Sequence, residues 1–396
     1  MDTAAWIFAQ TDAFVGYTYH FAGPVHLPLL RRAFEVVAAS YPILGAQLRM
    51  EHARVELGPG GRDPWLPTTP AKPSTAVHEG LNGTDAVHRL IVRRGESETL
   101  VTWLVHATIA DFAGCASLAI ELWGLYSALR GLGREPLNFE RYDRKPRYLA
   151  STTASVFNPR RRSVCTFTRG QLPRVDTKRL LNLAAAERIS LHSLVGAAAL
   201  RAEAELRSVP VRELPSLQSI SQRVELSTPA GVGLAGGIRL ASFRAAAADR
   251  GLVELAHAID TERLRGQHER HGVGTVTLAA TSAAKKRSEV VTYMQGGEFP
   301  SSCFHPELAF RAALPEFSFA ASPDASGLCL STALRNFYVA AIVDDQLTVH
   351  RRETDPESVI DGAFLTELGH KLSGLVVSGP PDRQTDGRTR EADSKS

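Results

Sequence analysis

The chain has 396 residues, of which 44% are hydrophobic and 22% charged, and its formal net charge is +3. This length exceeds one ordinary core and predicts two domains of roughly 150–200 residues each. The near balance of 45 basic and 42 acidic residues argues against nucleic acid as a bulk partner. We expect no membrane span and no secretory signal, because no apolar run approaches roughly 18–20 residues and no basic segment opens the chain. Four scattered cysteines without a CxxC pair favour a reduced, cytoplasmic protein without a metal site.

The first third of the chain predicts strands and helices in alternation. Residues 14–21 are rich in β-branched and aromatic side chains, which is typical of a strand. Apolar residues recur at helical spacing over 29–38, and Pro42 ends that helix. Two strands are predicted within 85–106, and the second is so apolar that we expect it to be buried on both faces. A helix follows with Leu118, Leu122, Leu125 and Leu129 on one side.

Residues 131–163 are polar, basic and proline-containing, and we interpret them as the connection between two lobes. Beyond them the patterns predict helices beginning at Asp176 and covering 190–206, 250–266 and 357–375. Strands are predicted near 163–168, 215–225, 237–243, 327–333 and 337–349. The sequence therefore predicts an α/β or α+β protein with an N-terminal lobe over 1–162, a C-terminal lobe over 163–377 and a disordered tail over 378–396.

One segment carries a recognisable motif. Residues 104–114 read Leu-Val-His-Ala-Thr-Ile-Ala-Asp-Phe-Ala-Gly at the end of the second predicted strand. The segment resembles the His-His-x-x-x-Asp-Gly motif of the condensation-domain superfamily. In this alignment His106 matches the first histidine and Asp111 the aspartate. Ala107 stands at the second histidine, and Phe112 at the glycine.

Four further segments resemble the polyketide-associated (Pap) acyltransferases of the same superfamily, in the same order. The first is the opening strand and helix together with residues 41–49 after the helix, and the second is the helix around 118–126. The third is the small-residue helix over 189–202. The fourth is 222–233, where Gln222-Arg223-Val224 stands in place of an Asp-Leu-Arg element. The resemblance covers about residues 1–375.

The resemblance implies two lobes, each like chloramphenicol acetyltransferase, arranged as a V-shaped pseudo-dimer with a channel between them. It implies an acyl donor, either coenzyme A or the phosphopantetheine of a carrier protein, and an alcohol or amine acceptor. The second histidine of the motif acts as general base in this superfamily, and the aspartate pairs with an arginine and holds the loop. No tightly bound cofactor is implied, and two lobes that share one internal interface make a monomer the expected state.

Ala107 removes that general base. His106 is then either a structural histidine bonded inside the lobe or a substitute base, although successive strand residues point to opposite faces. Asp111 is expected to fix the loop, with a direct catalytic role as the alternative. Ala107, Phe112, Gly114 and Arg223 are predicted to line the channel. Phe112 either narrows it or packs into a rearranged loop.

Other candidates are weaker. Arg160, Arg161 and Arg162 form either a solvated linker or a docking site for an acidic carrier protein or for coenzyme A phosphates. The glycine-rich run 229–237 lacks the lysine and the strand-to-helix context of a phosphate loop, so we interpret it as a connection. The isolated histidines are expected to be satisfied surface or core residues; these are His20, His192, His305, His268 and His271.

Three functions follow from these observations. The first is an acyltransferase of secondary-metabolite or complex-lipid biosynthesis that works without the usual histidine. The second is a repurposed protein that binds a polyketide or peptide intermediate and promotes its cyclisation or rearrangement, because Ala107 and Phe112 both make the site more apolar. The third is a non-catalytic partner that docks carrier proteins.

Overall fold

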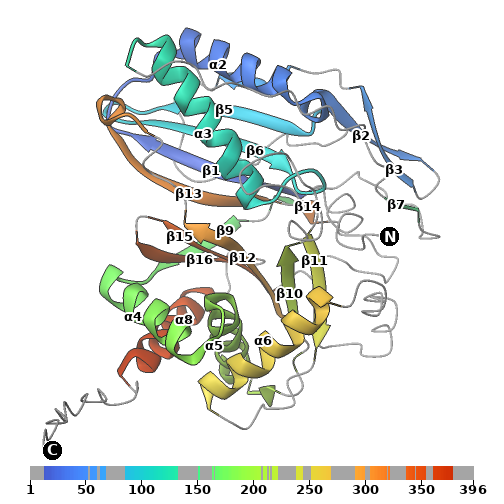
Figure 1. The fold of residues 1–396 in the computed structure, drawn as a ribbon, viewed down its shortest axis with the longest axis vertical. Coiled ribbons are helices and arrows are strands. Elements are labelled where there is room, and N and C mark those ends of the chain that lie inside the picture. Colours follow the sequence, from blue (N-terminus) through green and yellow to red (C-terminus); the bar gives the residue numbers. More distant parts are fainter. Residues whose placement is uncertain are drawn as a thin grey trace, which may run out of the picture.

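The computed structural model describes residues 13–51, 54–59, 63–67, 85–132, 150–151, 163–164, 166–206, 208–211, 214, 216–221, 238–243, 251–268, 290–298, 304–318, 320–321, 336–343, 345–353 and 360–377. These residues form two main sheets, each covered by helices, which lie one above the other in Figure 1. The mixture of helices and sheets confirms the predicted fold class. The predicted tail lies outside the described residues.

The upper lobe is built on a five-stranded sheet in the order β13-β1-β6-β5-β4. Helices α2 and α3 lie together over one face of this sheet (Figure 1). The bounds are β1 Phe14–Phe21, α2 Leu27–Ser40, η1 Pro42–Gly45, β4 Trp65–Pro67, β5 His88–Arg94, β6 Thr99–His106, α3 Phe112–Leu129, η5 Pro306–Leu308 and β13 Phe310–Ser318. A small sheet beside it contains β2 Ala46–Glu51, β3 Arg54–Pro59 and β7 Ala150–Ser151.

The lower lobe is built on a six-stranded sheet in the order β11-β10-β12-β15-β16-β9. Helices α4, α5, α6 and α8 gather below this sheet in Figure 1. The bounds are β9 Thr166–Gln171, α4 Arg174–Glu187, α5 Leu191–Leu206, β10 Ser216–Ser221, β11 Ile238–Phe243, α6 Leu252–His268, β12 Val290–Glu298, β15 Asn336–Val343, β16 Gln346–Glu353 and α8 Ile360–Val377. Two short strands, β8 Ser163–Val164 and β14 Ala320–Ala321, pair with each other.

Strand β13 was not anticipated from the sequence. It comes from the second half of the chain, yet it pairs antiparallel with β1 at the edge of the upper sheet. Pro315 within β13 weakened the strand pattern, and an edge strand is where a sheet tolerates proline. The boundary of the lobes at residues 162 and 163 stays a prediction, but one strand of the upper sheet lies beyond it in the sequence.

The expectation of a single strand over 337–349 was wrong. The segment contains all of β15 except its first residue and the first half of β16, which pair antiparallel with each other. Asp345 lies at the turn with φ 61, a left-handed conformation that aspartate tolerates better than most residues. The strand predicted at 327–333 lies outside the described residues.

Close packing of β1 on β6 depends on Gly16. A Cβ atom added to Gly16 would lie 1.9 Å from the carbonyl oxygen of Trp103 on the neighbouring strand. That contact is with backbone, so no side-chain movement can relieve it. Glycine at this position therefore lets the central pair of the upper sheet come together.

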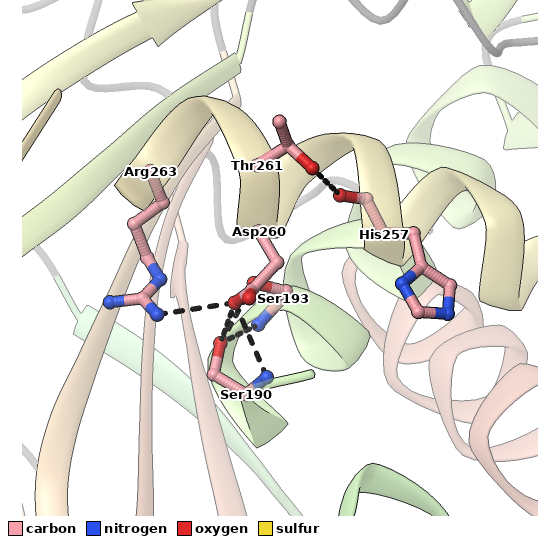
Figure 2. A network of polar contacts seen from close by, with 6 residues as sticks. All are labelled: Ser190, Ser193, His257, Asp260, Thr261 and Arg263. Carbon is pink, nitrogen blue, oxygen red and sulfur yellow. Dashed lines mark hydrogen bonds and ion pairs between the residues drawn. The ribbon is translucent and has the colours of Figure 1, made fainter. Parts of the chain in front are cut away.

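A buried carboxylate joins α6 to the start of α5 (Figure 2). Asp260 Oδ1 accepts hydrogen bonds from Ser190 N at 3.2 Å, Ser190 Oγ at 2.8 Å and Ser193 Oγ at 2.8 Å. Arg263 adds an ion pair at 3.1 Å. Burial raises the pKa of Asp260, but the bonds from Ser190 and Ser193 and the charge of Arg263 outweigh burial, so the net pKa is lowered. Ser190 also caps α5 by accepting from Ser193 N, which explains why the predicted helix begins there.

A neutral histidine lies in the upper core. The Trp103 indole N–H donates to His88 Nδ1 at 3.4 Å, and the Phe34 ring lies 5.3 Å away, centroid to centroid. Burial first, and then the positive charge of Arg89, lowers the pKa of His88 to about 3. The unfolded chain therefore binds a proton between pH 6.5 and about 3 that the folded chain does not bind.

We predict that this histidine makes the fold sensitive to acid. The free energy of unfolding should fall as the pH drops from 6.5 towards 3, by up to about 1.4 kcal/mol per pH unit from this group. Urea unfolding at several pH values should show that the free energy of unfolding changes less steeply with pH for His88→Phe than for the natural chain. The exposed His370 provides a matched control, since His370→Gln should keep the natural slope. Equal slopes for all three chains would contradict the assignment.

Candidate functional site

Strand β6 ends at His106, which is fully buried. Its Nδ1 atom lies 3.3 Å from the backbone N of Thr108 and 2.9 Å from the Thr108 hydroxyl. A backbone N–H can only donate, so Nδ1 is the acceptor and the neutral ring carries its proton on Nε2. The Phe14 ring meets the imidazole edge-on at 5.0 Å between centroids. These contacts hold the His106 ring inside the lobe.

Ala107 and His106 lie on opposite faces of the upper sheet. Ala107 belongs to the large apolar cluster that also contains Trp103 and Val105, whereas Leu104 belongs to a separate cluster with Phe14. The Ala107 N–H donates to the carbonyl of Ala13 at 2.8 Å, so position 107 is still held in register with the neighbouring chain segment. The imidazole of His106 therefore does not reach the place that a histidine at position 107 would occupy.

Asp111 holds the loop by capping the next helix. Its Oδ1 atom accepts a hydrogen bond from Gly114 N at 2.8 Å, the bond that an N-cap residue makes with the third helical residue. The N–H groups of Ile109 and Ala110 both point to the carbonyl of His106, at 3.0 and 3.3 Å. The turn between β6 and α3 is thus fixed at both ends by backbone bonds.

Phe112 packs into the lobe at the first residue of α3. It is fully buried, and its ring lies edge-on to Tyr17 at 5.7 Å between centroids. The Tyr17 hydroxyl donates to the carbonyl of Phe112 at 3.4 Å. A lining role for Ala107, Phe112 and Gly114 in a substrate channel stays a prediction.

Two other predicted sites cannot be placed. Arg223, expected beside the channel, and Arg160, Arg161 and Arg162, expected to dock a carrier protein or coenzyme A, lie outside the described residues. Among the residues that the structure describes, no three histidine, cysteine or acidic side chains gather as metal ligands would. No described helix is long and apolar enough to cross a membrane.

A family profile and solved structures resemble this chain. A profile of the phthiocerol/phthiodiolone dimycocerosyl transferase C-terminus matches residues 161–352. The structure resembles polyketide synthase associated protein 5 from Mycobacterium tuberculosis with a TM-score of 0.68 and 19% identity, over 94% of this chain and 96% of that one. The first condensation domain of the CDA synthetase gives a TM-score of 0.56 and 13% identity, over 93% and 94% of the two chains. The chain therefore shares the fold of condensation domains and Pap acyltransferases.

A curated relative extends the similarity to sequence. The phthiocerol/phthiodiolone dimycocerosyl transferase of Mycobacterium ulcerans (strain Agy99) is 26% identical over 263 residues. The match covers 57% of this chain and 61% of the relative, so less than two thirds of that relative is represented. The predicted resemblance to condensation domains and Pap acyltransferases is thereby confirmed.

Sequence reasoning missed a chain of polar side chains on the face of the upper sheet that carries His106. Thr102 lies four residues before His106 on β6, so both side chains share one face. Thr18 Oγ1 lies 2.8 Å from Thr102 Oγ1 and donates to Glu316 Oε1 at 2.6 Å. Threonine at 18 and 102 in two apolar strands was the available signal, whereas Glu316 enters only through the long-range pairing of β13.

A partly buried carboxylate on α3 was also missed. Tyr41, just beyond the end of α2, donates its hydroxyl to Glu121 Oε1. Burial raises the pKa of Glu121, and the bond from Tyr41 partly opposes this effect. Glu121 had been noted only as part of the resembling segment, because a helical pattern alone does not reveal which neighbour covers a side chain.

We predict that removing the cap of α3 destabilises the motif loop. Asp111→Ala should lower the free energy of unfolding by about 1 kcal/mol, because the N–H of Gly114 loses its acceptor. Asp111→Asn keeps an oxygen at the same position and should lose much less. Both values come from urea unfolding at neutral pH, and equal loss in the two variants would show that the charge rather than the cap matters.

Proposed function

We propose that the chain is an acyltransferase-like protein of complex-lipid or secondary-metabolite biosynthesis. In this proposal it moves an acyl group from a coenzyme A or carrier-protein thioester to an alcohol or an amine. The observation that carries the proposal is the transferase profile over residues 161–352, supported by a fold likeness that spans nearly the whole chain. The names of the related proteins suggest a lipid alcohol as the acceptor.

The chemistry requires a change of protonation at the acceptor. Its O–H or N–H attacks the thioester carbonyl, the carbon–sulfur bond breaks, and the acceptor proton finally resides on the released thiol. A positioned general base for this proton typically contributes about 10²–10⁴-fold in rate. Ala107 supplies none, and the His106 ring is held on the other face of the sheet by Thr108.

Catalysis without that base is still chemically reasonable. Holding the two reactants together replaces a bimolecular encounter, and well-oriented intramolecular reactions show effective molarities of about 10⁵–10⁸ M. An amine that is already neutral attacks a thioester without prior deprotonation. The proposal therefore assigns the chain positioning of substrates between the lobes, with the proton passing to solvent or to the departing sulfur.

We predict that Ala107→His raises the rate of acyl transfer, by up to about 10²–10⁴-fold, because it restores a base at the superfamily position. The measurement is product formation from acyl-coenzyme A or an acyl carrier protein with a panel of alcohols and amines. Ala107→Asn is the matched control, since its side chain is polar and of intermediate size but cannot take a proton near neutral pH. Thermal melting of each variant shows whether the buried position accepts the larger side chain.

The companion variant is His106→Gln. If this change alone abolishes transfer while Ala107→His has no effect, His106 performs the proton transfer by another route. If the folded natural chain and all variants show no transfer to any acceptor, the proposal of acyl transfer is wrong.

A second candidate function is suggested by the apolar surroundings of position 107. Ala107 lies with Ile109, Ala110 and Phe112 in one buried cluster, so no ionisable group from these positions faces a bound substrate. Such a site suits binding of a polyketide or peptide intermediate and its cyclisation or rearrangement. Accumulation of an unprocessed intermediate on deletion of the gene would favour this function, and carrier-protein affinity without any chemistry would favour a docking role.

A further inference from the structure

Helix α4 exposes large aliphatic side chains at the surface of the lower lobe. Val175 is 56% exposed and Leu181 is 40% exposed. Among the described residues only Val36 on α2 and Leu264 on α6 are large hydrophobics exposed to a similar degree, at 42% and 41%. Two of these four side chains therefore lie on a single helix, which packs beside α8 at the edge of the molecule (Figure 1).

Basic residues surround these aliphatic side chains. At 100° per residue, Arg174, Lys178 and Leu181 fall on one stripe of the helix, with Val175 next to Lys178 and Arg179. Arg188 follows the helix as its C-cap residue, in a left-handed conformation. The basic residues and the two aliphatic residues are all exposed. Thr177, Leu180 and Ala184 of the same helix are buried on the side that faces the lobe. The exposed side of α4 thus combines four cationic and two aliphatic side chains; we call it the α4 face.

Three of the four positive charges of the α4 face, all except Arg179, have no ion-pair partner within the described part of the chain. The two acidic residues of the helix, Asp176 and Glu187, lie away from the stripe and are each engaged. Asp176 lies 3.6 Å from Arg179, and Glu187 lies 3.3 Å from His257. No described acidic side chain lies within ion-pair distance of Arg174, Lys178 or Arg188.

We propose that the α4 face binds an anionic lipid surface. A helix with cationic residues beside exposed aliphatic ones is suited to the boundary between headgroups and acyl chains, where the long basic side chains reach the phosphates. The residues between the basic side chains on this face are the exposed Asn182, Ala185 and Ala186, none of which carries a charge. The proposal goes beyond acyl transfer and does not depend on it.

The experiment is flotation of the full chain with vesicles. One set contains phosphatidylcholine alone, and the other contains equal parts of phosphatidylcholine and phosphatidylglycerol. Binding to the anionic vesicles alone is expected, with loss of affinity as ionic strength rises, because exposed charges are screened. The double variant Arg174→Glu with Lys178→Glu should reduce the affinity by more than about tenfold.

The aliphatic contribution is tested by a matched pair. Leu181→Ser should weaken binding several-fold, whereas Leu264→Ser removes an equally exposed leucine from α6 and should leave binding unchanged. Circular dichroism and thermal melting verify that each variant remains folded, as expected for exposed positions.

Four outcomes would overturn the proposal. They are no binding to either vesicle, equal binding to both, an undiminished affinity of the charge-reversed variant, and equal effects of Leu181→Ser and Leu264→Ser. Binding of a soluble polyglutamate peptide with the same sensitivity to the variants, but no binding to vesicles, would assign the α4 face to an acidic protein instead. Acyl transfer to a water-soluble acceptor, measured without vesicles, is unaffected by any of these outcomes.

Discussion

The upper lobe depends on the pairing of β1 with two strands from distant parts of the chain. β6 brings His106 opposite Phe14, and β13 brings Ser318 to the other side of the same residue. Closing so long a loop is costly in chain entropy, although the cost grows only slowly with length. Burial of a cluster of aromatic rings offsets this cost; the rings belong to Tyr19, Phe21, Trp123, Phe304 and Phe310. The second half of the sequence therefore completes the core of the first lobe.

The same sheet fixes what the motif can do. The N–H of His106 donates to Val87 and that of Ala107 donates to Ala13, so both residues are held by backbone bonds on their two sides. Successive side chains along such a strand point to opposite faces of the sheet. A rotation of the backbone that turned His106 to the face of Ala107 would break these hydrogen bonds. The missing histidine at 107 is consequently not replaced by a small movement of its neighbour.

The buried carboxylates of the lower lobe and the exposed basic residues of α4 have different surroundings. In the lower lobe, Tyr338 donates to the buried Glu203, and Arg351 reaches Tyr338 Oη at 3.1 Å and Glu203 Oε1 at 3.2 Å. Asp260 is likewise surrounded by donors. Buried charges need such partners because desolvation is costly, whereas solvent allows the cations of α4 to stay without them.

The sequence by itself determined the local elements and the resemblance to condensation domains and Pap acyltransferases. The strand at 14–21, the helix stopped by Pro42, the buried strand before His106 and the helix beginning after Ser190 all follow from periodicity, capping and proline, which act over a few residues. Asp111 was expected to fix the loop, but the N-cap bond by which it does so was found only in the structure. Only the tertiary structure decided that β13 joins the first sheet, that Glu316 meets Thr18, and that His88 is neutral. Those features depend on pairing and burial between residues far apart in the chain, and neither periodicity nor composition encodes which distant segment becomes the neighbour.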